Sequence, residues 1–539
     1  MARTIDDTAL EVARAYLSSI SPTNPPPISD IKADIIDQTA AVFEIENTQR
    51  PTGQKWHIPK ALFPIQIAMA ISTLYEVRRI AMGGLDVEPE YDILAIYHRD
   101  GYNKGLYVGD ENALERLVCE FNHCATPNEI KNVIYFIRMR AKRVERTHDE
   151  NLIPMGNGVF DYASKQLLPF SPKYVFTVKS HVDYNPAARN VIIHNPNDNT
   201  DWDVETWLSE LSDDPEMVEL LWCVISAVLR PNVAWDKSIW LYSEVGNNGK
   251  GTLCELLREL LGKGAYTSLG LSDFAEDFML EGLASVSAVI TDENDVGIFI
   301  DKAANLKAII TGDVVKINRK FKTPIAIRFN GLLIECVNEI PRVKDKSESF
   351  YRRLLVIPFD KCFTEIERKY IKRDYIKRKE VLEYVAYKAL NMDCSEFPAP
   401  ERCKRILGEY KLNNDPVRQF LDDVLPELKL NVVPHKLLYS LYKAWFKEFV
   451  PSGMVEADRT FKRSVEMALR NSNEWYYMKN DDRAIPIIEE LEPLIIRYGI
   501  KEWYNPHYSG NDPDKIAIPP SGNYRGLKRL DNKGRLYDN

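Results

Sequence analysis

The sequence lacks an excess of positive charge, a cysteine framework and a long hydrophobic run. Its 79 acidic residues outnumber its 70 lysines and arginines, and the formal net charge of -9 excludes a generally basic nucleic-acid coat protein. Eight scattered cysteines in 539 residues argue against a disulfide scaffold and predict a reducing, cytoplasmic compartment. The most apolar long stretch, residues 61–77, contains a proline and several polar residues. We therefore expect neither a membrane span nor a membrane partner.

The remaining composition, with 45% hydrophobic residues, is typical of a globular multidomain protein. Two amphipathic helices expected at 434–450 and 457–469 are typical of a winged-helix or helix-turn-helix unit. We predict an α/β fold class with five parts: a helix and proline-rich linker in 1–60, an α+β domain in 61–202, an α/β layer domain in 203–395, a winged-helix-like domain in 396–503 and a polar tail in 504–539.

A phosphate-binding loop is predicted in the α/β domain. The strand "SIWLY" is followed by the glycine loop "SEVGNNGKGT" and by an apolar-faced helix that ends at Gly262. Small residues let consecutive backbone N–H groups surround a phosphate at a helix N-terminus, and Lys250 adds a positive charge. We expect ATP and Mg²⁺ as cofactors. The predicted phosphate-contacting residues are Gly246, Asn247, Asn248, Gly249, Lys250, Gly251 and Thr252.

Two positions of this loop depart from the common P-loop pattern. Glu244 stands where the first glycine is expected, and Gly251 stands where a hydroxyl residue follows the lysine, with Thr252 one place later. Adenylate kinases also carry Gly-Lys-Gly-Thr. The pattern leaves open whether Thr252 contacts Mg²⁺ directly or through water, and whether the loop is instead a glycine-rich turn without a ligand.

Polar residues at the ends of three further segments fit the same site. An apolar strand over 286–290 leads into Asp292 and Glu293, a candidate magnesium ligand and water-activating base. Asn338 follows the apolar strand "GLLIECV", and Arg352 and Arg353 precede "LLVIPF". The alternatives are solvated acids in a turn and solvated arginines at a strand edge.

This ordered set resembles the superfamily 3 helicases, AAA+ ring motors of viruses, phages and mobile elements, over about residues 203–361. The resemblance implies that Asp292 binds magnesium together with Thr252, that Glu293 polarises the attacking water, and that Asn338 is the polar sensor. It further implies that Arg353 is the arginine finger of a neighbouring subunit, with Arg352 as second choice.

The resemblance also implies a pore hairpin at "INRKFKTP", with Lys320, Phe321 and Lys322 contacting single-stranded DNA. Core packing is the alternative for Phe321. A homo-oligomeric ring, hexameric in the family, would translocate 3′ to 5′ on single-stranded DNA and unwind duplex DNA during replication initiation of a phage or mobile element.

The flanking segments resemble those of phage and poxvirus primase–helicases, but residues 1–150 carry no convincing primase metal motif. We therefore expect a helicase without primase chemistry, which works with a separate primase or loading protein. Two other functions stay open. One is an origin-binding scaffold with weak ATPase activity, suggested by Glu244 and Gly251, and the other is a nucleotide kinase.

Two basic stretches, residues 136–146 and 367–379, are candidate DNA contacts. The first is predicted to end a helix over 128–146, and the C-terminal helical pair is a candidate for docking on duplex DNA. A solvated helix face is the alternative for both stretches.

Overall fold

The computed structural model describes residues 4–22, 24–319, 322–364, 368–449, 455–487 and 490–530, with side chains from 324 onward in the third range. The chain forms two compact units, Met1–Lys404 and Arg405–Asn539, and the boundary falls within helix α13 (Glu401–Asn414). None of the helices in the described ranges has both the length and the apolar character needed to cross a membrane.

The N-terminal helices share one core rather than forming a separate segment. Helices α1 (Ile5–Leu17) and α2 (Ile28–Thr48) pack with α3 (Pro64–Leu74), α4 (Glu111–Phe121) and α5 (Pro127–Arg140). The buried Gln66 amide donates to the Ala9 carbonyl at 3.0 Å and to Thr39 Oγ1 at 2.8 Å. The expected division at residue 60 is therefore wrong, because the proline-rich stretch only turns the chain between α1 and α2.

A small sheet follows, in the order β3-β2-β1-β4. Its strands β2 (Ile93–Tyr97) and β3 (Tyr107–Val108) form an antiparallel pair. The helix predicted over 128–146 ends earlier, because β4 (Lys142–Glu145) pairs in parallel with β1 (Arg78–Ala81). Beyond it lie short antiparallel pairs made by β5 (Leu152–Pro154), β6 (Val159–Asp161), β7 (Gln166–Leu168), β8 (Ile193–Asn195) and β9 (Thr200–Trp202).

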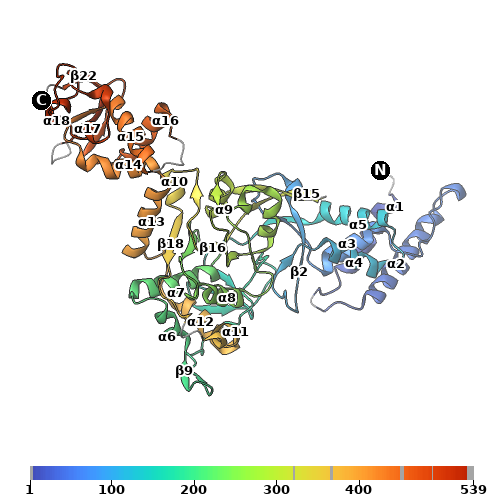
Figure 1. Ribbon diagram of the computed structural model, residues 1–539. Coiled ribbons are helices and arrows are strands. Elements are labelled where there is room, and N and C mark those ends of the chain that lie inside the picture. Colours follow the sequence, from blue (N-terminus) through green and yellow to red (C-terminus); the bar gives the residue numbers. More distant parts are fainter. Residues whose placement is uncertain are drawn as a thin grey trace. The chain divides into compact units, whose positions relative to one another are not determined.

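A five-stranded parallel sheet in the order β11-β12-β16-β10-β18 forms the centre of the first unit and confirms the α/β prediction (Figure 1). Strands of a parallel sheet are buried on both faces and therefore consist of continuous apolar runs, as in "SIWLY" and "GLLIECV". The strands are β10 (Ser238–Tyr242), β11 (Tyr266–Thr267), β12 (Ala288–Thr291), β16 (Leu332–Val337) and β18 (Leu354–Pro358). Helices α6 (Val204–Glu210), α7 (Pro215–Leu229), α8 (Lys250–Leu261) and α12 (Lys379–Asn391) share the sheet's core.

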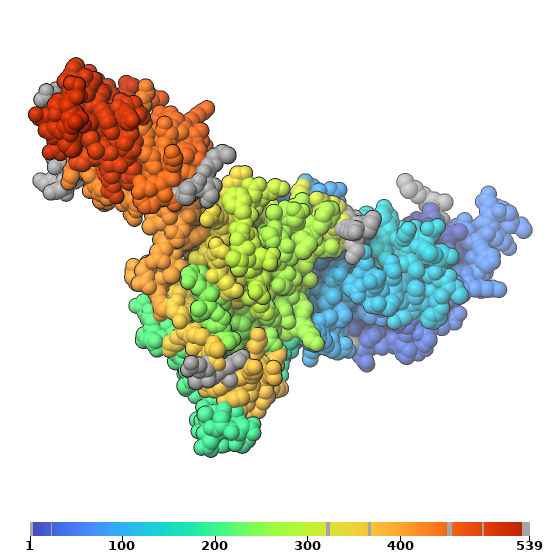
Figure 2. Space-filling view, viewed as in Figure 1, coloured from blue at the N-terminus to red at the C-terminus, as the bar shows by residue number. Residues whose placement is uncertain are grey.

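The chain between β12 and β16 carries a hairpin outside the sheet. Strands β14 (Val314–Arg319) and β15 (Lys322–Arg328) are antiparallel, after β13 (Phe299–Ile300) and α9 (Ala304–Ile310). The base of the hairpin contacts the N-terminal sheet, since the Arg328 amide donates to the Met82 carbonyl at 3.0 Å. In Figure 2 the blue surface of the N-terminal part correspondingly meets the green surface of the P-loop part. After β16 come β17 (Arg342–Val343) and α10 (Glu348–Tyr351).

The described part of the second unit contains a sheet in the order β19-β23-β20 and a smaller sheet of β21 (Ile485–Ile487) and β22 (Gly522–Tyr524). Two of its helices are short, α17 (Leu494–Arg497) and α18 (Pro513–Ile516). The two predicted helices are present as α15 (His435–Phe449) and α16 (Asp458–Ala468), and α14 (Pro416–Val424) precedes them. The predicted polar tail is wrong for residues 504–530, because β23 (Gly526–Arg529) pairs with both β19 (Val432–Pro434) and β20 (Trp475–Tyr477). Leu527 of this central strand is fully buried.

Candidate nucleotide site

The glycine loop connects β10 to α8 with the backbone that a phosphate cradle needs. Asn247 and Gly249 have φ angles of 53° and 91°, in the left-handed region that only glycine and asparagine adopt readily. A Cβ at Gly249 would lie 2.5 Å from Leu211, so this position also requires glycine for space. The Phe363 amide donates to the Asn247 carbonyl at 2.8 Å and ties the loop to the segment after β18.

Lys250 begins α8 and points into the edge of the sheet. Only 6% of the residue is exposed, and its Nζ donates to Asn338 Oδ1 at 2.9 Å and to the carbonyls of Ser243 and Val337 at 3.3 Å. Burial lowers the pKa of Lys250 below its usual value. The loop lysine and the asparagine after β16, both predicted for the site, therefore lie in direct contact.

The acidic pair Asp292 and Glu293 follows β12 at the same carboxyl edge of the sheet. Strand β16, which precedes Asn338, lies between β12 and β10. Asp292 and Glu293 are both exposed, and Asp292 Oδ2 accepts a 2.7 Å hydrogen bond from Arg258 of α8. Arg258 also donates to the Ile290 carbonyl at 3.0 Å. The sequence analysis did not identify Arg258 as a site residue. It could have done so, because Arg258 lies two helical turns after Lys250 on the same predicted helix.

A fully buried carboxyl, Glu335, lies behind the acidic pair, and sequence reasoning missed it as well. Asn294 Nδ2 donates to Glu335 Oε2 at 2.9 Å, and the Leu271 amide donates to Asn294 Oδ1 at 2.8 Å. Burial raises the pKa of Glu335 well above its usual value. The loop after β12 is thus hydrogen-bonded to the middle of β16, which fixes where Asp292 and Glu293 leave the sheet.

The two candidate finger arginines have different surroundings. Arg353 is half-buried, and its guanidinium donates to the Ser349 hydroxyl at 2.8 Å and to the Ser349 carbonyl. Arg352 is exposed, and within the described ranges its side chain makes no hydrogen bond or ion pair. Both residues lie immediately before β18.

Of the residues predicted to contact DNA, Lys320 and Phe321 lie outside the described residues, and Lys322 begins β15. The described strands β14 and β15 agree with the hairpin that the resemblance implied.

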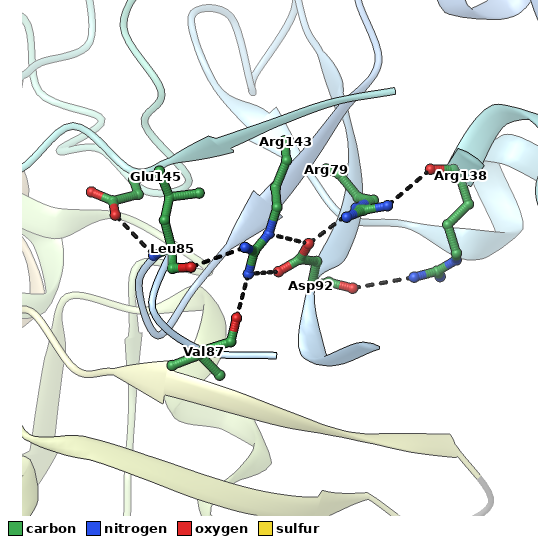
Figure 3. A network of polar contacts seen from close by, with 7 residues as sticks. All are labelled: Arg79, Leu85, Val87, Asp92, Arg138, Arg143 and Glu145. Carbon is green, nitrogen blue, oxygen red and sulfur yellow. Dashed lines mark hydrogen bonds and ion pairs between the residues drawn. The ribbon is translucent and has the colours of Figure 1, made fainter. Parts of the chain in front are cut away.

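The first basic stretch is used largely inside the protein (Figure 3). Arg143 donates to both oxygens of Asp92, at 2.8 and 3.1 Å, and Arg79 donates to the same carboxylate at 3.0 Å. Arg138 donates to the Asp92 carbonyl at 3.2 Å. Arg146 is bonded to the Arg328 carbonyl at the base of the hairpin. These arginines hydrogen-bond β1 and β4 to neighbouring segments of the chain. Most of the stretch predicted as the basic face of a helix is therefore not an exposed helix face.

The second basic stretch forms α11 (Lys369–Arg373), the turn Tyr375–Lys377 and the start of α12. Several of its cations face carboxylates of the same unit, including Lys377 with Glu255 and Glu259, and Arg378 with Asp374. Helix α11 carries the exposed cations Lys372 and Arg373. It lies against a cavity of about 360 Å³ at the glycine loop.

This cavity is within the size range of small-molecule sites. Its lining comes from α6, the glycine loop and the segment after β18: Trp207, Glu210, Leu211, Asn247, Asn248, Gly249, Gly251, Thr252, Phe363, Arg368, Lys369, Ile371, Lys372 and Arg373. Five of the seven residues predicted to contact phosphate line it, namely Asn247, Asn248, Gly249, Gly251 and Thr252. The donor set, with main-chain amides, a buried lysine and a threonine hydroxyl, fits a nucleotide phosphate chain.

A glycine loop and a buried lysine at the carboxyl edge of a parallel sheet define an α/β protein of the P-loop class. Three family models match the chain: "D5 N terminal like" over residues 67–213, a family of unknown function (DUF5906) over 241–353, and "Poxvirus D5 protein-like" over 412–494. The glycine loop lies in the second of these.

One curated relative is the "Putative helicase L207/L206" of Acanthamoeba polyphaga mimivirus, 24% identical over 351 residues. The match covers 61% of this chain, which spans only 34% of the relative's length. Together with the two D5 matches, it supports a likeness of the chain to the D5-type primase–helicases of phages and viruses.

The chain is also similar to a solved structure described as the apo C-terminal region of NrS-1, residues 305–718. The identity is 14%, the TM-score is 0.44, and the match covers 80% of this chain and 98% of that chain. Another apo structure of the NrS-1 C-terminal region gives a TM-score of 0.41, with 14% identity, and covers 75% of this chain and 86% of that chain.

Proposed function

We propose that the protein is an ATP-driven DNA helicase of the superfamily 3, AAA+ type that acts in replication. The observation that carries this proposal is the contact between Lys250 of the glycine loop and Asn338 after β16, 2.9 Å apart. In a hydrolysing P-loop enzyme a cation and a polar group must both reach the γ-phosphate. A turn without a ligand would not require a buried lysine at this place.

Each site residue has a role in this proposal. The main-chain amides of residues 246–252 bind the phosphates, and Lys250 leaves the Asn338 side chain for the β- and γ-phosphates. Thr252 and Asp292 would hold Mg²⁺, and the bound ion would supply positive charge to offset the charge that develops on the phosphates. Glu293, exposed beside Asp292, orients and polarises the attacking water.

Ring assembly would complete the site, as in the family. An arginine of the neighbouring subunit would stabilise charge on the γ-phosphoryl group, and hydrolysis would then depend on a hexameric ring. Arg353 remains our first choice by its place in the motif. The exposure of Arg352 and its lack of a partner among the described residues support Arg352 as the alternative.

DNA would be contacted in two places. The hairpin of β14 and β15 would carry Lys320, Phe321 and Lys322 to single-stranded DNA and move it 3′ to 5′. In the second unit α14, β19, α15, α16 and β20 follow one another, and β23 closes the sheet after β21, α17, α18 and β22. The helix pair α15 and α16 beside this sheet supports a winged-helix domain that docks on duplex DNA.

A second function, an origin-binding scaffold with weak ATPase activity, is favoured by one observation. Asp292, the proposed magnesium ligand, is already paired with Arg258 at 2.7 Å. If that pair persists with nucleotide present, turnover would be slow. A nucleotide kinase, the third possibility, would transfer phosphate to a nucleoside monophosphate without responding to DNA.

The test is the ATPase rate with and without single-stranded DNA for the wild type and for Lys250→Ala, Arg352→Ala and Arg353→Ala. The helicase proposal expects stimulation by DNA, loss of about 100-fold or more in Lys250→Ala and in one arginine variant, and partial recovery when these two are mixed. Recovery arises because mixed rings contain intact composite sites. ATP binding without DNA-stimulated turnover would contradict the helicase proposal and favour the scaffold function. Phosphate transfer to nucleoside monophosphates would favour the nucleotide kinase.

A further inference from the structure

Gly251 is the position at which this P-loop lacks the usual hydroxyl residue, and a cation from elsewhere in the chain lies over it. A Cβ built on Gly251 would lie 3.2 Å from the Nζ atom of Lys372 in α11. The ammonium group of Lys372 therefore lies against the first turn of α8, next to the start of the helix at Lys250. Any side chain at position 251 would compete with Lys372 for this space.

Lys372 differs from three other cations of its stretch in having no carboxylate partner among the described residues. Arg368, Lys377 and Arg378 each face a carboxylate: Arg368 pairs with Glu210, and the other two have the partners given above. Lys372 is exposed, and it makes no hydrogen bond or ion pair with any residue in the described part of the chain. No carboxylate among the described residues therefore neutralises its charge.

The electrostatics at this point call for an anion. The N-terminus of α8 carries a partial positive charge, because its first amides have no helical acceptors. Lys250 and Lys372 add two full positive charges at the same turn, and such a group repels itself unless an anion lies between its members. A polyphosphate has the charge and the length to contact both lysines.

The other side of the same cavity is apolar. Trp207 and Leu211 of the α6 region and Ile371 of α11 are 5%, 4% and 5% exposed, and Phe363 is half-buried beside them. Such walls suit a planar, weakly polar ring system. The cavity thus combines a cationic side at the glycine loop with an apolar side formed by α6 and α11.

We propose that α11 is part of the nucleotide site of its own chain, with Lys372 as a second phosphate-binding lysine and the Trp207, Leu211 and Ile371 wall as the base site. The ligand class is a nucleoside triphosphate. This inference rests on the proposed ATP-binding function. Under this inference Lys372 contacts the nucleotide, whereas the sequence analysis treated its basic stretch as a candidate DNA contact.

The first test measures affinity for the magnesium complex of β,γ-imido-ATP by titration calorimetry. Lys372→Ala should bind at least about tenfold more weakly than the wild type, Lys372→Arg should recover most of the loss, and Lys131→Ala, an exposed lysine of α5, should bind like the wild type. Equal affinities of Lys372→Ala and Lys131→Ala would overturn the inference. So would a loss of single-stranded DNA binding in Lys372→Ala with nucleotide affinity unchanged.

The second test is a double-mutant cycle with Gly251→Ser. In the wild-type background the serine side chain should displace the Lys372 ammonium and weaken binding about threefold or more. In the Lys372→Ala background it should have no further effect. Additive losses would overturn the inference. Lys250→Ala separates the two proposals, because unchanged nucleotide binding in that variant contradicts the proposed function itself, whereas a loss there with a normal Lys372→Ala contradicts only the role of α11.

Discussion

Arg258 and Asp292 form a 2.7 Å ion pair that joins the P-loop helix α8 to the end of β12. Arg258 is largely buried, with a side chain 14% exposed, whereas the Asp292 side chain is 47% exposed. The pair therefore holds the proposed magnesium ligand from the protein side and leaves part of its carboxylate open. Arg258 both orients the carboxylate and offsets its charge.

The charge of Arg258 should weaken magnesium binding at Asp292. We expect Arg258→Gln, which retains a donor but not the charge, to reach half-maximal ATPase activity at an Mg²⁺ concentration about three- to tenfold lower than the wild type. Arg258→Lys retains the charge and serves as the matched control. A Mg²⁺ requirement that is the same in all three proteins would show that Asp292 is not the metal ligand.

The buried Glu335 should make stability fall at high pH. Its folded-state pKa lies above the usual 4.5, so its contribution to stability is fully present below that value and is lost as the pH rises towards the folded pKa. Glu335→Gln cannot ionise. As the pH rises from about 5 to 8, the wild type should therefore lose unfolding free energy relative to this variant.

Chemical denaturation of both proteins across that pH range measures the effect. A parallel pH dependence of the two proteins would mean that Glu335 is not held neutral in the fold. Asn294→Ala, which removes the donor to Glu335 Oε2, should destabilise the wild type by about 1–3 kcal/mol.

His181 should produce the opposite pH dependence. Its ring stacks on Tyr102 with 3.8 Å between the centroids, and burial, together with the charge of Lys179, lowers its pKa from 6.5 to about 4. A histidine with a lowered folded-state pKa contributes stability that is present above about pH 6.5 and is lost as the pH falls towards 4.

His181→Phe keeps the stacked ring but cannot bind a proton. Because the ring is only half-buried, solvent reduces the effect, and we expect the wild type to lose about 1–2 kcal/mol relative to the variant between these pH values. Urea denaturation at several pH values measures it. If the variant shows the same acid sensitivity as the wild type, other groups are responsible for it.

Exposed apolar side chains near the acidic pair should contribute to contacts between copies of the chain. Val296 and Phe299 are 68% and 58% exposed on the segment that follows Glu293. A ring that places the neighbouring arginine at this site would cover them. We expect Val296→Asp with Phe299→Asp to abolish assembly, measured by analytical ultracentrifugation with nucleotide.

Ile45 of α2 is 65% exposed and provides the matched control. Ile45→Asp should leave assembly unchanged. Equal assembly of the double variant and the wild type would contradict a ring interface at this segment, whatever the ATPase rate.

Local patterns predicted the parts of the site that are contiguous in the chain. The glycine loop, its strand and its helix follow from residues 238–262, and the apolar strands before Asp292 and Asn338 follow from their composition. The contact of Lys250 with Asn338 could be anticipated, because β16 and β10 are neighbours in a parallel sheet whose carboxyl ends share one edge.

Residues that act through distant partners could not be predicted in this way. Arg143 looked like a member of a basic helix, yet it lies on β4 and binds Asp92, 51 positions earlier. Residues 504–530 looked like a tail because they are rich in proline, glycine and charge, yet β23 within them is the centre of a sheet. Long-range strand pairing overrides local composition in both cases.

The sequence by itself determined that a P-loop begins α8, because the chemistry of a phosphate cradle is carried by consecutive residues with their own backbone preferences. Only the tertiary structure decided which charges remain available to a ligand. Whether a lysine or arginine is neutralised depends on carboxylates brought beside it by folding, as Glu255 is to Lys377, and no such carboxylate lies beside Lys372 in the part of the chain described.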